Sequence, residues 1–383
     1  DPDKADWSWS DQRLGRIRKL GLEAIAGLVH HGSGPRYTDL LDPAFPRLLA
    51  RHAERVAERY PWLEDFTPVN EPLTTARFSA LYGIWYPHHK TEASFLKALF
   101  HQCWATVLSM RSIRRITPSA RLIQTEDLGR VFSSHAMTYQ AAYENERRWL
   151  SFDLLMGRVD RAHPFYQRFV DSGISERLLQ AMVDDPCPPD VFGINHYLTS
   201  DRYLDDEAEG YPGDAVGGNG QDIYADVAAV RVPDPRLEGQ LGLRARLREV
   251  WERYRRPLAI TEVHNGCTRE EQVRWLCDAW SAANRLRTEG VPVQALTIWT
   301  LVGAVDWTSM LTKHQGHYEP GPSTHAPHHR VQLPSPGRYA NSHPRRGTII
   351  RFWQRQAGGD DPIDIIALSR RCTSLPSSGD GRS

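Results

Sequence analysis

The chain has 383 residues, of which 40% are hydrophobic, and its 47 basic residues balance its 47 acidic ones. This length and composition allow a large buried core, arranged as one barrel-sized domain or as two ordinary domains. A formal net charge of zero removes the electrostatic case for nucleic acid or an anionic membrane as the main partner. A neutral or sugar-like substrate is favoured instead.

The sequence indicates neither a secretion signal nor a membrane span. Its first residues lack a charged segment followed by an apolar one, and no run of about 18 apolar residues occurs. We therefore expect a cytoplasmic protein. The five cysteines show no CxxC spacing, so we expect no zinc site, and no motif calls for a metal or a cofactor.

Short apolar runs alternate with amphipathic stretches along the chain, which is typical of repeated βα units. The expected strands span residues 24–29, 66–70, 121–125, 191–195, 258–261 and 295–300. The expected helices span residues 11–21, 46–60, 94–116 and 269–287. Six βα units are visible where a closed barrel needs about eight.

Two segments do not follow this alternation. Residues 205–221 are acidic and rich in glycine, which predicts a loop. Residues 322–383 contain no lysine and no glutamate and are rich in Arg, Ser, Pro, His and Gly, so we expect a largely disordered tail without a function. The structured domain is therefore expected to span residues 1–321.

Two glutamates, Glu71 and Glu262, each close an apolar run at widely separated points of the chain. Two carboxyl groups that meet in one cleft can cleave a glycosidic bond, one as a neutral proton donor and the other as an ionised carboxylate. Taken singly, each glutamate could equally well cap a following helix. A third carboxylate candidate is the pair Glu126 and Asp127 at the end of the strand expected at residues 121–125, and we interpret it as structural.

The residues around the two glutamates resemble family 1 glycoside hydrolases, the β-glucosidase family. Residues 67–72 are similar to the acid/base motif, in which Asn-Glu-Pro closes the fourth strand of a (β/α)8 barrel. Residues 260–266 resemble the nucleophile motif of strand seven. Val263 and His264 stand between Glu262 and the following Asn-Gly, which departs from the family pattern and predicts a shifted loop after the nucleophile.

Three further motifs follow the family order. Residues 28–35 are similar to the strand-three segment whose histidine contacts the sugar, and residues 193–197 resemble the strand-six segment whose tyrosine orients the nucleophile. Residues 299–307 resemble the strand-eight sugar site, which holds an aromatic platform, then an acid and a tryptophan. The acid here is Asp306 where the family usually has glutamate, so its reach is shorter by one methylene.

The resemblance implies a retaining hydrolase of small β-glycosides that needs no metal and no cofactor. The implied catalytic residues are the acid/base Glu71, the nucleophile Glu262 and its partner Tyr197. The implied sugar-binding residues are His31, Asn70, Asn195, Trp299, Asp306 and Trp307. The fold implied is an α/β (β/α)8 TIM barrel.

The chain opens at what resembles the segment before strand three, so strands 3–8 are recognisable and strands 1–2 are absent. An incomplete barrel exposes sheet edges, through which we expect self-association. Residues 30–35, 74–78 and 316–320 also resemble a divergent branch in which such a domain is fused to a reductase similar to dTDP-4-dehydrorhamnose reductase. A second hypothesis therefore stays open, namely a catalytically inactive sugar-binding or scaffold domain of a nucleotide-sugar-modifying protein.

Overall fold

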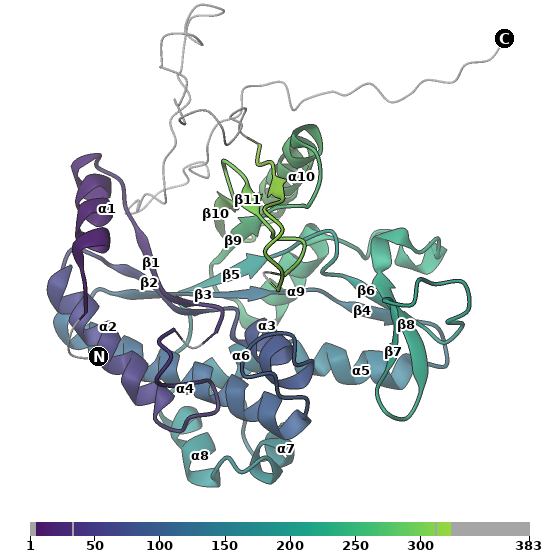
Figure 1. Cartoon of the computed structure of the whole chain (residues 1–383), viewed down its shortest axis with the longest axis horizontal. Helices are drawn as coiled ribbons and strands as arrows, with labels where there is room; N and C mark the ends of the chain where they lie inside the picture. The colour runs from purple at the N-terminus through teal and green to yellow at the C-terminus, as the bar shows by residue number, and fades with distance from the viewer. Residues whose placement is uncertain (1–4, 33, 311, 323–383) are drawn as a thin grey trace, which may run out of the picture.

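The computed structural model describes residues 5–32, 34–310 and 312–322. Its main sheet has six parallel strands in the order β1-β2-β3-β5-β9-β10 (Figure 1). The strands are β1 (Ile25–His30), β2 (Asp65–Asn70), β3 (Arg121–Asp127), β5 (Val191–Asn195), β9 (Leu258–Val263) and β10 (Val293–Ile298). All six predicted strands are confirmed, since no predicted end differs from the observed one by more than two residues.

This strand order is that of consecutive strands in a (β/α)8 barrel. Within the described part of the chain no strand lies between β1 and β10, so these two strands are the edges of the sheet. The fold is therefore the predicted α/β barrel with six of its strands recognisable. The predicted tail falls almost wholly outside the described residues, so the domain boundary at residue 321 stays a prediction.

Helices pack against the outside of the sheet and link its strands (Figure 1). The longer ones are α1 (Ser8–Lys19), α2 (Phe45–Arg59), α4 (Glu92–Ile116), α5 (Thr138–Arg147), α9 (Leu243–Tyr254) and α10 (Arg269–Thr288). The shorter ones are α3 (Pro72–Ala76), the π-helix η1 (Arg77–Leu81), α6 (Leu150–Leu155), α7 (Tyr166–Asp171), α8 (Glu176–Asp184) and the 3₁₀-helices η2 (Ala229–Arg231) and η3 (Pro235–Leu237). None of the helices in the described residues is long and apolar enough to cross a membrane.

Side-chain caps fix where the two longest helices begin. The Thr91 side chain accepts a hydrogen bond from the Ser94 backbone N–H at the start of α4. At the start of α10, Thr268 and Glu271 form a reciprocal capping box. Each cap satisfies backbone N–H groups that would otherwise lack a partner, which contributes about 1 kcal/mol to helix stability.

The core lies between the sheet and its helices. Every residue of β2 is buried, as expected of a parallel strand covered on both faces. Phe66 and Val69 of β2 belong to one apolar cluster with Phe45 of α2 and Phe100 of α4, and a second cluster joins β5, β9 and β10 to α9 and α10. Burial of one such large side chain stabilises the fold by about 1.5–3 kcal/mol.

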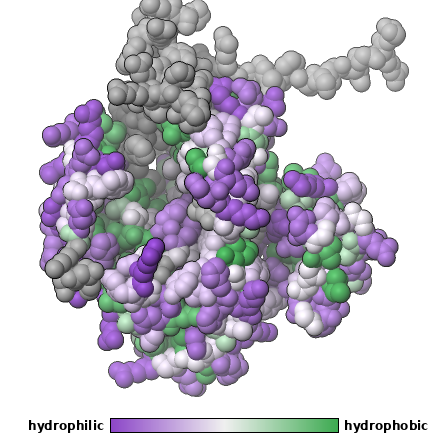
Figure 2. All heavy atoms as spheres, in the orientation of Figure 1, coloured by the Kyte–Doolittle hydropathy of each residue, from purple (hydrophilic) through white to green (hydrophobic). Residues whose placement is uncertain are grey.

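A second, four-stranded sheet projects beside α5 (Figure 1). Its order is β4-β6-β8-β7, formed by β4 (Val131–Ser133), β6 (Arg202–Asp205), β8 (Ile223–Ala228) and β7 (Val216–Gly218). Two short antiparallel strands, β11 (Ala304–Val305) and β12 (Tyr318–Glu319), complete the described chain. Figure 2 shows that the viewed face is mostly hydrophilic, with apolar residues in separate small groups.

The second sheet corrects the expectation of a continuous loop at residues 205–221. Residues Val216–Gly218 pair in antiparallel register with Ile223 to Ala225 of β8. Glycine disfavours strands on its own, so local propensity could not predict β7. Its pairing comes from the tight connection to β8, which brings the two segments together.

Candidate active site

The two predicted catalytic glutamates lie at the carboxyl ends of strands of the main sheet. Glu71 directly follows β2 and has left-handed backbone angles, with φ of 45°. Glu262 is the next-to-last residue of β9. Their relative exposures are only 4% and 8%, so both carboxyl groups are almost completely shielded from solvent.

Asn195, the last residue of β5, connects the two glutamates. Its Nδ2 donates a hydrogen bond of 2.6 Å to Oε1 of Glu71, and its Oδ1 accepts one of 2.6 Å from the Thr261 hydroxyl. Asn195 is also the register partner of Glu262 across the β5–β9 pair. The sheet therefore brings together two glutamates that are far apart in sequence.

The environment of the two carboxyl groups is asymmetric. Burial raises the pKa of Glu71 well above its usual value, and the charges of Glu262, Asp127 and Glu126 raise it further, against the hydrogen bond from Asn195. Burial also raises the pKa of Glu262, to about 7, while hydrogen bonds from Tyr197 and Asn195 lower it and the charge of Asp127 raises it. Glu262 therefore ionises more readily, and Glu71 retains its proton.

The hydrogen-bond pattern also shows which oxygen of Glu71 can carry this proton. Oε1 accepts from Asn195, which leaves Oε2 for the proton. The nearest basic group to Oε2 is His31, whose Nε2 lies 3.9 Å away. Burial, and then the neighbouring His30, lower the pKa of His31 to about 3, so this histidine is neutral at ordinary pH and does not take the proton.

Tyr197 contacts Glu262 directly. Its hydroxyl donates a short hydrogen bond to Oε2 of Glu262. Burial, followed by the charges of Glu262 and Glu71, raises the pKa of Tyr197 well above its usual value, so the phenol keeps the proton that it donates. This contact holds the carboxylate in a fixed orientation and favours its ionised form.

Two further polar side chains, Asn70 and His31, lie close to Glu71. Asn70 accepts a 2.7 Å hydrogen bond from the Thr125 hydroxyl, whereas its Nδ2 is buried and has no partner among the described residues. The His31 Nδ1 lies 2.9 Å from the Thr75 hydroxyl, and its ring packs against Trp85 with centroids 4.7 Å apart. A buried amide without a partner is costly, and a bound hydroxyl would satisfy it.

The aromatic residues after β10 cluster near Tyr197. The rings of Trp299 and Trp307 lie 5.7 Å apart, and Trp307 is 5.2 Å from the ring of Tyr197. His264 is completely buried and packs nearly perpendicular to both tryptophans, at 4.9 Å and 4.6 Å. His264, which departs from the nucleophile motif, therefore supports the two tryptophans. The motif itself did not indicate this role.

The carboxylate of Asp306, unlike the other predicted sugar-binding groups, accepts several backbone hydrogen bonds. Its carboxylate accepts backbone N–H groups from Gln315, Gly316 and His317 at 2.8–3.0 Å. Burial would raise the pKa of Asp306, but these three N–H donors lower it on balance. The observed contacts of Asp306 therefore hold its own loop, and its predicted contact with sugar stays a prediction.

The carboxylates Glu126 and Asp127 differ in their roles. Glu126 matches the structural interpretation, whereas Asp127 is part of the site. Glu126 accepts backbone N–H groups of Leu73 and Thr74, and so holds the start of α3. Asp127 accepts from the Ser200 hydroxyl at 2.5 Å, and its charge raises the pKa of both catalytic glutamates. Sequence reasoning missed this effect; the only signal was the position of Asp127 at the end of a strand.

Comparisons with known proteins agree with this fold. No protein-family model matches the chain. It is 24% identical over 345 residues to a 6-phospho-β-glucosidase of Dickeya chrysanthemi, a match that covers 81% of this chain and 69% of that protein. A family 1 β-glucosidase of Thermotoga maritima superposes with a TM-score of 0.63 and 14% identity, over 82% of this chain and 71% of that one, and the same values hold for its complex with deoxynojirimycin. The chain is therefore similar in sequence to a 6-phospho-β-glucosidase and has the fold of the family 1 glycoside hydrolases.

Proposed function

We propose that this protein hydrolyses the O-glycosidic bond of small β-glycosides by a retaining, double-displacement mechanism. The observation that carries the proposal is a pair of buried glutamates at the carboxyl ends of β2 and β9, both adjacent to Asn195 and with pKa values raised by burial. Glycoside hydrolysis needs one carboxyl group protonated and the other ionised. Asn195 supports the proposal further, because it holds Glu71 in place beside Glu262.

In the first step, the Glu262 carboxylate attacks the anomeric carbon while Glu71 protonates the leaving oxygen. The bond to the leaving group breaks, the alcohol departs, and a glycosyl ester of Glu262 forms. This step consumes the negative charge of Glu262, which is the second-largest cause of the raised pKa of Glu71. Glu71 has given its proton to the alcohol, and without the charge of Glu262 nearby it can stay ionised. In the second step it takes a proton from the water that attacks the anomeric carbon, which breaks the ester and releases the sugar and the Glu262 carboxylate.

The neighbouring side chains are suited to binding the sugar. Asn70 Nδ2, which has no partner among the described residues, would donate to a hydroxyl beside the anomeric centre. Trp299 and Trp307 offer apolar faces to a sugar ring, and neutral His31 offers a ring nitrogen to a hydroxyl. The sequence relative is named a 6-phospho-β-glucosidase, so the substrates to be tested include a 6-phosphorylated β-glucoside. Cytoplasmic location and self-association stay predictions.

One observation favours the second hypothesis, a sugar-binding domain without turnover. The main sheet is open between β1 and β10, and His31 follows the edge strand β1 directly with 22% of its side chain exposed. A site that admits bulk water at this edge would bind sugar but would stabilise the transition state less well.

The test is the intact mass of the protein after incubation with a 2-deoxy-2-fluoro β-glycoside that carries an activated leaving group. We expect one added glycosyl unit on the wild type, none on Glu262→Ala, and the adduct on a peptide that contains Glu262. Glu270→Gln, a change at a well-exposed glutamate on α10, is the matched control and is expected to form the adduct. Absence of an adduct on folded wild type across glucosides, galactosides and 6-phosphoglucosides would favour the binding domain.

A further inference from the structure

The short segment that carries Tyr197, residues 196–201, is held by contacts on both sides. The His196 Nδ1 lies 2.9 Å from the Leu128 carbonyl, and the Tyr197 backbone N–H donates to the Ser200 hydroxyl at 2.9 Å. Asp201, at the end of the segment, accepts backbone N–H groups of Arg130 at 2.8 Å and Gly242 at 2.7 Å. The position of the tyrosine hydroxyl thus depends on where Asp201 is held.

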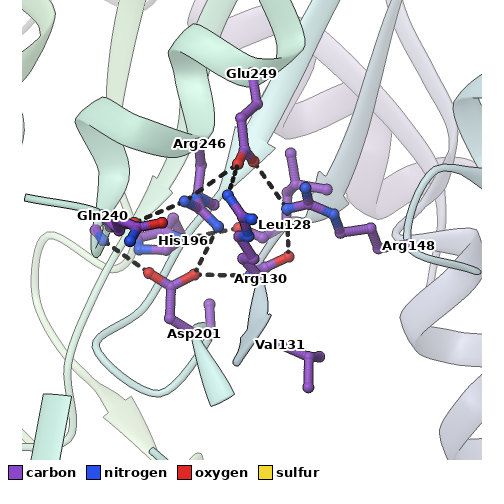
Figure 3. Close-up of polar contacts among 12 residues, drawn as sticks. Leu128, Arg130, Val131, Arg148, His196, Asp201, Gln240, Arg246 and Glu249 are labelled. Carbon is purple, nitrogen blue, oxygen red and sulfur yellow. Dashed lines mark hydrogen bonds and ion pairs between the residues drawn. The ribbon is translucent and has the colours of Figure 1, made fainter. Parts of the chain in front are cut away.

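Behind Asp201 lies an ionic cluster, shown in Figure 3, in which Arg246 and Asp201 are buried while Arg130 reaches the surface. Arg246 of α9 is 1% exposed, and its Nη1 lies 3.5 Å from Oδ1 of Asp201. Its Nη2 donates to the Gln240 carbonyl at 2.8 Å and lies 3.4 Å from Glu249. Glu249 is in turn paired with Arg130 at 3.2 Å and Arg148 at 2.9 Å.

Removing the charges of this cluster from water costs free energy. Three arginines, at 130, 148 and 246, face two carboxylates, and Nε and Nη1 of Arg246 have no hydrogen-bond partner within the described structure. Burial lowers the pKa of Arg246, against the charges of Asp201 and Glu249. Apolar side chains would often stabilise such a position better, so a buried ionic network suggests a purpose other than stability.

We infer that Arg246 is a positioning residue, which fixes Asp201 and so holds Tyr197 against the nucleophile Glu262. The inference rests on the proposed function and adds a residue that touches neither the sugar nor the catalytic glutamates. Arg246 anchors Asp201 to α9, Asp201 anchors the end of the 196–201 segment, and the segment presents the Tyr197 hydroxyl to Oε2 of Glu262.

Arg253 offers a matched control on the same helix. It pairs with the fully buried Asp153 at 2.5 Å, and its described contacts do not reach the 196–201 segment. Arg253→Met removes the ion pair with Asp153, and Arg246→Met removes the ion pairs with Asp201 and Glu249. Both are expected to lower the midpoint of thermal unfolding, but only Arg246→Met should affect the chemistry.

The experiment measures the rate constant of adduct formation with the 2-fluoro glycoside for wild type, both Arg→Met variants, Tyr197→Phe and the double variant Arg246→Met/Tyr197→Phe. We expect Arg246→Met to slow the reaction by up to about 10-fold, no more than Tyr197→Phe does, because it acts through the same hydroxyl. We expect Arg253→Met to stay within about 2-fold of the wild type. In the Tyr197→Phe background, Arg246→Met should have no further effect, because both changes remove the same contact.

A second readout is the acidic limb of the pH–rate profile. The Tyr197 hydroxyl lowers the pKa of Glu262, so Arg246→Met should move this limb upward by about one pH unit. If Arg246→Met does not fold, Arg246→Lys keeps the charge without the planar fork and is expected to show the same changes. Wild type that forms no adduct would overturn the proposed function, whereas equal effects of the two Arg→Met variants, or additive effects with Tyr197→Phe, would overturn only this inference.

Discussion

The acid/base side of the site and the strand-eight side match equally specific motifs, yet they are built in different ways. Glu71, Asn195 and Glu262 are placed by strands, and hydrogen bonds between neighbouring strands tie them together. The described segment after β10 contains the short strands β11 and β12 and is held largely by its own contacts, in which Asp306 binds the backbone of residues 315–317. A motif at a strand end therefore predicts where its side chains lie in the folded protein, whereas a motif on a long loop predicts only which residue types are present.

The largest expected effect is a loss of kcat, and it should differ between two buried glutamates, one from each region. Glu262→Gln should lower kcat by about 10⁴-fold or more, because it removes the nucleophile. Glu319→Gln changes a glutamate that holds Thr308 in the strand-eight loop, and should destabilise the loop while adduct formation persists. Steady-state kinetics measure the activity of both variants, and circular dichroism measures their stability. Equal losses of kcat would contradict the claim that the two regions contribute differently to catalysis.

The next effect concerns the leaving group. Glu71→Gln cannot donate a proton, so hydrolysis of an alkyl β-glycoside should fall by about 10²-fold to 10⁴-fold. A dinitrophenyl glycoside needs little protonation of its leaving oxygen, so its rate of adduct formation should fall much less. Pre-steady-state release of dinitrophenol measures this rate, and an identical loss for both substrates would show that Glu71 is not the acid.

The pH dependence of kcat/KM should be bell-shaped. The raised pKa of Glu262, about 7, sets an acidic limb because the carboxylate must lose its proton, and the still higher pKa of Glu71 sets a basic limb because the acid must keep its proton. Tyr197→Phe removes a hydrogen bond that lowers the pKa of Glu262, so the acidic limb should move to higher pH and kcat/KM should fall by about 10-fold. A profile that is unchanged in Tyr197→Phe would contradict this assignment.

The smallest effect on activity is expected at Asp306. Asp306→Ala removes the acceptor of three backbone N–H groups, so the loop should loosen and the midpoint of thermal unfolding should fall, while KM rises less than about 10-fold. Thermal unfolding followed by tryptophan fluorescence, together with KM, separates the two effects. A rise in KM of about 100-fold at unchanged thermal stability would instead support the sugar contact that the resemblance implied.

What the sequence could predict follows the same division. The strands of the main sheet were predictable because strands buried on both faces appear as apolar runs, as in residues 191–195 and 258–263. The convergence of Glu71 and Glu262 was implied by family resemblance, but the bridging role of Asn195 depends on the register between β5 and β9. That register is a property of the folded sheet and cannot be read from spacing in the chain.

Other features depended on contacts between distant segments. The strand β7 contains two glycines and exists because β8 pairs with it. His264 appeared only as a departure from a motif, and its packing between two tryptophans requires loops that are about 40 residues apart in sequence. The influence of Asp127 on both glutamates is likewise electrostatic and acts through space.

The most direct test of the central claim, that Glu71 and Glu262 form a retaining pair, is the configuration of the first product. Proton NMR can follow a β-glycoside during the first minutes of hydrolysis, before mutarotation equilibrates the anomers. Double displacement predicts that the β-anomer of the free sugar appears first, with the α-anomer following only as mutarotation proceeds. Initial release of the α-anomer, or no release by folded protein from any of the glycosides tested, would contradict the account.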